Sequence, residues 1–304
     1  MKEKNKKVQN KIKLSMDDRI FYIVSYTIVA LLTLIVLYPV IYIISASFSS
    51  GTAVSQGKVW LYPVDFSLDG YKAVFHYQNI WIGYRNTIFY VIFGTLINLV
   101  MTMFCAYPLA RNRLVGHSFF SFLFAFTMLF GGGMIPNYIL VQKLGMLNTV
   151  WAMLVPGAMS VYNMIVARTF IQSNIPDELL EAAQIDGCDN IRFFFQIVLP
   201  LSKAILAVLG LWYAVGHWNA YFNAFLYLSD KQLYPLQIFL KDILVQSQFD
   251  ASMFEDPELA RQAYNIKLLL KYSMIVVSTA PLFVFYPFVQ KYFIKGVMIG
   301  SVKG

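Results

Sequence analysis

A short stretch of the sequence places side-chain amides among aromatic rings inside an apolar run. It reads LWYAVGHWNAYFNAFLY and covers Leu211–Tyr227. On a continuous helix, one stripe along this stretch holds four residues: Trp212, Gly216, Asn219 and Asn223. Aromatic faces and amide hydrogen bonds inside a largely apolar pocket suit a ligand that is rich in hydroxyl groups. The stretch is therefore a candidate lining for a ligand path.

Further aromatic and imidazole side chains border this stripe. The full set of candidate path residues is Trp212, His217, Trp218, Asn219, Tyr221 and Asn223. Amides at membrane depth are costly unless they face a cavity or a partner helix. The alternative interpretation is that these amides bond to neighbouring helices, and that rings near Tyr227 belong to the aromatic belt of the interface. Ser160 and Asn163 are weaker candidates for the same path.

A second stretch is unusual because it is charged between two apolar runs. It reads EAAQIDGCDNIRFFFQIVLP and covers Glu181–Pro200. Pro176 suits the first turn of a helix, and the acidic residues that follow it complement the positive end of the helix dipole. Gly187 can end that helix with a positive φ, and Asp189 or Asn190 can cap the next one. The sequence therefore predicts a helix, a turn and a second helix that leads into the following apolar run.

This predicted helix pair has two possible roles. Ala182 and Ala183 are small enough for another backbone to approach closely, and Glu181 offers a charge to a basic partner. These features suit insertion into a groove on another protein. An amphipathic helix that lies in the membrane interface without a partner is the alternative.

The sequence contains no recognisable catalytic or metal site. The glycines Gly131–Gly133 lack the Lys and the hydroxyl of a phosphate-binding loop, and no H-E-x-x-H pattern occurs. The histidines are scattered, and Cys105 and Cys188 have neither metal-ligand spacing nor an expected disulfide. We expect no catalytic residue, no metal ion and no bound cofactor, so energy for any driven process must come from another chain.

Composition indicates an all-α polytopic membrane protein. The 304 residues are 58% hydrophobic and 13% charged, with a mean hydropathy of +0.58, whereas a soluble domain carries about 25% charged residues. Six apolar runs without Asp, Glu, Lys or Arg are long enough to be spans: Ile20–Ala46, Thr87–Leu109, Ser118–Val141, Val150–Ala167, Ala204–Leu228 and Tyr272–Gln290.

Two of these predicted spans need comment. The third contains glycines and a proline, so it is expected to exit near Phe130 and continue as a short surface helix. The first follows a basic segment and resembles a cleaved signal peptide. Its run of apolar residues is longer than a typical signal sequence, which favours an uncleaved span.

The distribution of basic residues predicts the orientation, because Lys and Arg favour the cytoplasmic side. With both termini inside, 15 of the 24 Lys and Arg residues and 8 of the 16 acidic residues lie in the cytoplasm. The inside then carries +7 and the outside +1, which accounts for the net charge of +8. A basic N-terminal tail also occurs in nucleic-acid-binding proteins, but here topology and anionic lipid explain it better.

This topology predicts three parts of the chain. Residues 1–19 form a basic cytoplasmic segment, residues 20–295 a transmembrane domain, and residues 296–304 a cytoplasmic tail. Within the transmembrane domain, residues 176–200 form a cytoplasmic helix pair between spans four and five. Residues 229–271 form an extracellular loop, in which an apolar helical pattern follows Pro235.

The charged stretch resembles the signature of permease subunits of bacterial ABC importers. That pattern is E-A-A, three residues, G, nine residues and I-x-L-P, and the matching residues are Glu181, Ala182, Ala183, Gly187, Ile197, Leu199 and Pro200. WNAYFNAFLYL at Trp218–Leu228 and the tail Gln290–Gly304 resemble the carbohydrate permeases of the maltose-transporter (MalG-like) type. Phe130–Thr149 is similar to the LplC-like subgroup, found mainly in Gram-positive bacteria.

The resemblance covers nearly the whole chain and implies a type I ABC importer permease fold of six spans. It implies that the helix pair is a coupling helix that contacts the ATPase, with Glu181, Ala182, Ala183, Asp186, Gly187, Ile197, Leu199 and Pro200 as its coupling residues. The implied partners are a second permease that is a different chain, two cytosolic ATPase subunits that bind ATP and Mg, and an extracellular lipid-anchored sugar-binding protein. Membrane lipid is expected around the chain, and nucleic acid is not expected as a partner.

Two other functions stay open on the sequence. The E-A-A pattern alone does not exclude an ABC importer permease for a peptide or phosphate, although the LplC-like features and Leu211–Tyr227 favour an oligosaccharide. A multi-spanning membrane enzyme would need a catalytic constellation near a membrane face, and the sequence shows none.

Overall fold

The structure is a computed structural model that describes residues 15–111, 114–245 and 256–301, with side-chain surroundings as far as residue 287. All regular structure in these ranges is helical. The lysines predicted for the basic N-terminal segment before residue 15 and the last residues of the predicted tail, 302–304, lie outside the described residues.

Within the described ranges, three helices are long and apolar enough to span a membrane: α1 (Met16–Ser47), α4 (Gln78–Leu109) and α15 (Pro257–Ser301). They contain the predicted first, second and sixth spans. Ser15 caps α1, because its hydroxyl accepts the N–H of Asp17 and its own N–H donates to the Asp18 carboxylate. From Ile20 to Ser47, α1 carries no charged residue, as a lipid-facing helix requires.

The other predicted spans are broken. α5 (His117–Leu129) and α6 (Met134–Lys143) are bent by 113° at the glycine run, so the helix breaks near Phe130 as predicted, and an exit from the membrane there stays a prediction. Pro156 and Gly157 separate α7 (Trp151–Leu154) from α8 (Val161–Asn174). α12 (Lys203–Trp218) ends before α13 (Phe222–Tyr227). The prediction of one continuous helix in spans four and five is therefore wrong.

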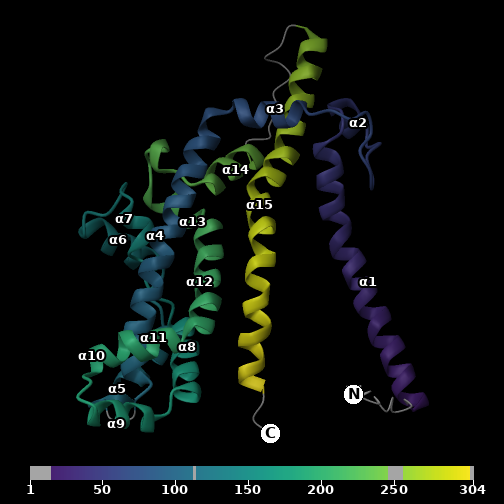
Figure 1. Cartoon of the computed structure of the whole chain (residues 1–304). Helices are drawn as coiled ribbons and strands as arrows, with labels where there is room; N and C mark the ends of the chain where they lie inside the picture. The colour runs from purple at the N-terminus through teal and green to yellow at the C-terminus, as the bar shows by residue number, and fades with distance from the viewer. Residues whose placement is uncertain (1–14, 112–113, 246–255, 302–304) are drawn as a thin grey trace, which may run out of the picture.

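Short elements lie at the two ends of the long helices. At one end, where α1 begins and α15 ends, the elements after α8 are α9 (Asp177–Ile185), α10 (Asn190–Phe193), a π turn (Phe194–Val198) and α11 (Leu199–Leu201) (Figure 1). At the other end are α2 (Gly51–Ser55), α3 (Asp69–His76), a 3-10 turn (Lys231–Leu233) and α14 (Leu236–Val245). Counting each bent pair as one span gives up to five spans in the described residues, so six stays a prediction.

The core lies where α4 packs against α8 and α12. Met103 and Ala106 of α4, Met164 of α8 and Leu209 of α12 are buried in one cluster. α1 stands apart from this core (Figure 1) and contacts α15 near the C-terminal end of α1, where Tyr42 packs edge-on against Tyr272 at 5.8 Å. No residue in the most apolar window of α1 is buried, so lipid or another subunit must cover it.

Polar side chains of α4 hold the segment that leads into α14. The Asn86 amide donates to the carbonyls of Gln232 at 2.6 Å and Tyr234 at 3.0 Å. The Thr87 hydroxyl accepts the N–H of Leu236 at 2.8 Å. These bonds satisfy backbone groups that would otherwise be buried without partners. The helix predicted after Pro235 is confirmed, and α4 determines its position.

The close approach of α14 to α4 requires a glycine. A Cβ on Gly83 would lie 2.9 Å from the Cα of Leu236. Gly83→Ala should lower the apparent Tm of the purified protein by several degrees, because overpacking costs about 1–3 kcal/mol. The temperature at which the detergent-solubilised protein loses its monodisperse elution peak measures this effect.

Gly216→Ala is the matched control, because no atom lies within 4 Å of a Cβ added on this exposed glycine of α12. It should leave the Tm unchanged or raise it slightly, since Ala is the better helix former. Equal Tm values for Gly83→Ala and Gly216→Ala would show that the α4–α14 contact is looser than described.

Candidate functional site

The α9–α10 unit (residues 176–200) is the helix, turn and helix predicted from the charged stretch. Gly187 has φ +78°, which a residue with a Cβ adopts only at a cost. The N–H of Gly187 donates to the carbonyl of Gln184 at 3.0 Å, and that of Cys188 to the carbonyl of Ala183 at 2.8 Å. This pair of bonds is a Schellman motif, and it ends α9 sharply.

α9 presents one face outward and buries the other. Glu181, Ala182 and Ile185 are exposed, and Ile185 reaches 87% exposure. Leu180 is buried, and the half-buried Ala183 packs against the same apolar cluster. Ala182 can therefore allow close approach by another protein. The expectation that Ala183 does the same is wrong, because its side chain faces the body of the chain.

The second half of the unit leads into α12. The Asp189 carboxylate caps α10 by accepting the N–H of Arg192 at 2.7 Å. Ile197 and Leu199 pack against the cluster that holds α9, whereas Pro200 is exposed. A bend of 79° separates α10–α11 from α12. Displacement of α9 can therefore reach α12 through packed side chains as well as through the chain itself.

Arg111 ties α9 to the end of α4. Its guanidinium donates to the carbonyl of Ile175 at 3.0 Å and to the carboxylate of Asp177. Sequence reasoning counted this arginine only toward the charge of the inner side. The sequence offered two signals for this contact. Arg111 is a basic residue directly after an apolar span, and Asp177 is an acidic residue in the first turn of α9.

A polar seam joins α4 to the break in span four and to α12. The Asn98 amide donates to the carbonyl of Gly157, and its oxygen accepts the N–H of the His217 ring at 2.6 Å. Tyr213 of α12 contacts the hydroxyl of Thr102 at 2.7 Å and accepts the N–H of Ser160 at 3.1 Å. Sequence reasoning missed Asn98, although an amide within an apolar span is itself a signal.

The structure divides the six candidate path residues into two groups. His217 bonds to Asn98, and Trp218 is 7% exposed and donates to the carbonyl of Ser278 at 3.1 Å. These two residues therefore join α12 to neighbouring helices. Trp212 is half-buried and stacks on Tyr162.

The remaining candidates lie at the break after α12. Asn219, Tyr221 and Asn223 are all exposed, and the amide of Asn219 donates back to the carbonyl of Val215 at 2.9 Å. The single stripe predicted from Trp212 to Asn223 does not exist, because α12 ends at Trp218. Residues after Trp218 no longer follow the helical repeat that would place them on one face with Trp212.

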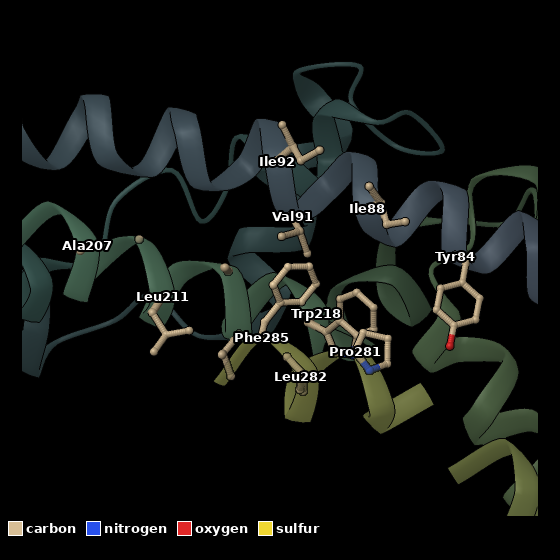
Figure 2. A pocket seen from close by; sticks show the side chains of 13 residues that line it. Tyr84, Ile88, Val91, Ile92, Ala207, Leu211, Trp218, Pro281, Leu282 and Phe285 are labelled. Atoms are coloured by element: carbon tan, nitrogen blue, oxygen red, sulfur yellow. The ribbon is translucent and has the colours of Figure 1, made fainter. Parts of the chain in front are cut away.

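An apolar cavity of about 560 Å³ lies between α4, α12 and α15. Figure 2 shows side chains from the three helices facing one another across it, among them Ile88, Val91, Trp218, Leu282 and Phe285. Its walls offer hydrocarbon and aromatic surface and almost no polar atoms. The cavity by itself therefore lacks the hydrogen-bonding groups that a hydroxylated ligand needs.

Comparison with known proteins identifies the family. Residues 79–299 match the family described as "Binding-protein-dependent transport system inner membrane component". The chain is 39% identical to the polygalacturonan/rhamnogalacturonan transport system permease protein YtcP of Bacillus subtilis, covering 95% of this chain and 100% of the relative. It is 40% identical to protein LplC of the same organism, covering 89% and 90% respectively.

A solved structure agrees in fold. One chain of a bacterial ABC transporter involved in the import of the acidic polysaccharide alginate superposes with a TM-score of 0.83 and 37% identity. The match covers 93% of this chain and 99% of that chain. The chain therefore belongs to the binding-protein-dependent transport system inner membrane components, the permease subunits of ABC importers.

Proposed function

We propose that the chain forms half of the translocation path of an ATP-driven importer for an oligosaccharide. The observation that carries this proposal is the α9–α10 unit, with its sharp glycine turn and an exposed face at one end of the membrane helices. The unit joins α12 at one end of α4, and the polar seam links α4 to the break in span four. Movement imposed on α9 thus has a physical route to the membrane interior.

The proposed partners supply what this chain does not: the other half of the path, the binding of ATP and the delivery of the ligand. A second permease subunit, which is a different chain, covers the other half of the path and part of α1. Two cytosolic ATPase subunits hold ATP and Mg, since this sequence has no phosphate-binding loop. An extracellular lipid-anchored binding protein delivers the ligand to the outer surface formed by α14 and its neighbours.

The proposed location is the plasma membrane of a Gram-positive bacterium, with both termini and the α9–α10 unit in the cytoplasm. The asymmetry of Lys and Arg supports this orientation. The start of α1, the α9–α10 unit and the end of α15 also lie at one end of the molecule (Figure 1). Residues 229–271 then form the extracellular loop, of which residues 229–245 and 256–271 are described.

Within oligosaccharides, we infer that the ligand is acidic. YtcP is named for polygalacturonan and rhamnogalacturonan, and the solved transporter for alginate, and uronic acid units make these polymers acidic. The exposed amides and ring after α12, Asn219, Tyr221 and Asn223, are the groups of this chain that we assign to the ligand path. Peptide and phosphate are disfavoured, because relatives over nearly the whole chain are named for sugars.

The first test concerns the coupling role of α9. Glu181→Lys reverses the charge of the exposed face, and Gly187→Val places a β-branched residue at a positive φ. Both variants should insert into the membrane normally, yet retain about tenfold less ATPase subunit on affinity purification and lose uptake, because they disturb a charge-assisted contact or its geometry.

Gly145→Val is the matched control for backbone strain, since Gly145 also has a positive φ, of 68°, and open space around its Cα. It lies in the α6–α7 connection, away from α9. Normal uptake in both α9 variants would contradict the coupling assignment. Equal loss in all three variants would point to general instability.

The second test concerns the ligand. Cells that express the complete transporter should take up labelled trigalacturonate, and unlabelled oligogalacturonate in excess should abolish this uptake. Maltotriose in equal excess should leave it unchanged. Competition by maltotriose alone would show a neutral-sugar importer, and loss of peptide uptake with intact sugar uptake in a deletion strain would overturn the carbohydrate assignment.

A further inference from the structure

Arg111 occupies an environment that is costly for an arginine. It follows the last turn of α4 and is only 8% exposed. Its Nη1 carries both hydrogen bonds to the α8–α9 junction, while Nε and Nη2 are buried without a hydrogen-bond partner in the described structure. A buried cation that is only partly satisfied destabilises a fold relative to a well-packed apolar side chain. Packing alone therefore does not account for an arginine at this position.

The contacts of Arg111 converge from four helices. The Ile175 carbonyl comes from the end of α8, and the Asp177 carboxylate comes from the first turn of α9. The guanidinium carbon also lies 5.7 Å from the ring centroids of Tyr107 in α4 and Phe193 in α10. A planar guanidinium can lie near two rings while it bonds to two oxygens, and a lysine ammonium cannot reproduce that geometry.

Two other side chains of α9 face inward and make apolar contacts. Leu180 is buried, and Ala183 is half-buried in the same apolar cluster. Apolar packing resists separation but allows a short helix to rotate or slide, because dispersion and hydrophobic forces are not directional. The Arg111–Asp177 pair adds a directed bond at the N-terminal end of α9, at the opposite end of the helix from the Gly187 turn.

We propose that Arg111 is a positioning residue that makes α9 and α4 move as one body. A force on the exposed face of α9 then displaces α4. The polar seam passes this displacement from α4 to the break in span four. Without Arg111, α9 would move relative to α4, and α4 would stay in place. This inference rests on the proposed function, because it assumes that an ATPase moves α9.

The test uses the complete transporter in liposomes, with its ATPase subunits and binding protein, and labelled trigalacturonate as the probe. Arg111→Gln and Asp177→Asn should keep the ATPase subunits bound and keep basal ATP hydrolysis. Uptake per ATP hydrolysed should fall about tenfold, the size expected for one lost charge-assisted hydrogen bond. Arg111→Lys should restore this ratio only in part.

Arg168→Gln is the matched control. Arg168 is a half-buried arginine of α8 whose hydrogen bonds go to Ser121 and His117 of α5, away from α9. It should lower stability to a similar degree and leave uptake per ATP unchanged. If uptake and hydrolysis fall together in Arg111→Gln and Asp177→Asn, or if the ratio is unchanged, Arg111 has only a structural role.

A second measurement separates this inference from the proposed ligand. Hydrogen exchange of the α9 amides in the resting complex should be faster in Arg111→Gln than in the wild type, and unchanged in Arg168→Gln. This result needs no sugar, so a wild-type complex that fails to import trigalacturonate would refute the ligand alone. Unchanged exchange in Arg111→Gln would overturn the proposal that Arg111 holds α9 to α4. If Arg111→Gln does not assemble, Asp177→Asn decides the matter, because the side chain of Asp177 is 47% exposed and its replacement disturbs the packing less.

Discussion

A backbone that breaks inside a membrane must find hydrogen-bond partners within the protein, because lipid supplies none. In this chain α4 and Arg111, directly after it, supply such partners at the break in span four and for backbone groups at the two ends of the molecule. Asn98 satisfies the carbonyl at Gly157, Asn86 satisfies two carbonyls before α14, and Arg111 satisfies the carbonyl at the end of α8. The long, continuous α4 thus allows its neighbours to be short, bent or interrupted.

Through these hydrogen bonds, α4 supports elements at both ends of the molecule. At one end α4 holds α14 through Asn86 and Thr87, and at the other it holds α9 through Arg111. Between them, Asn98 reaches both the break in span four and His217 of α12. An importer needs the surface that receives the ligand and the surface that receives the ATPase to be mechanically linked. In this chain one helix contacts both.

The sequence predicted those parts of the fold in which local chemistry decides the outcome. The unbroken apolar runs became α1, α4 and α15, and Pro176, Gly187 and Asp189 marked the α9–α10 unit correctly. Spans four and five were mispredicted because hydropathy averages over Gly157 and Asn219, where the chain leaves the helix. The side chains that bond to the backbone at the break in span four lie on α4 and α12, far away in sequence, so no local pattern revealed them. For the same reason, no local pattern revealed that His217 and Trp218 bond to neighbouring helices.

The central claim is that α9 and α4 move together when the ATPase subunits close. The most direct measurement is the distance between spin labels at Gln184 of α9 and Trp81 of α4, both exposed, with Cys105 and Cys188 replaced by alanine. In the assembled transporter this distance should be the same at rest and after trapping with ATP and vanadate. The distance from Gln184 to a label on the second permease should change. A change in the distance between α9 and α4 on trapping would contradict the account.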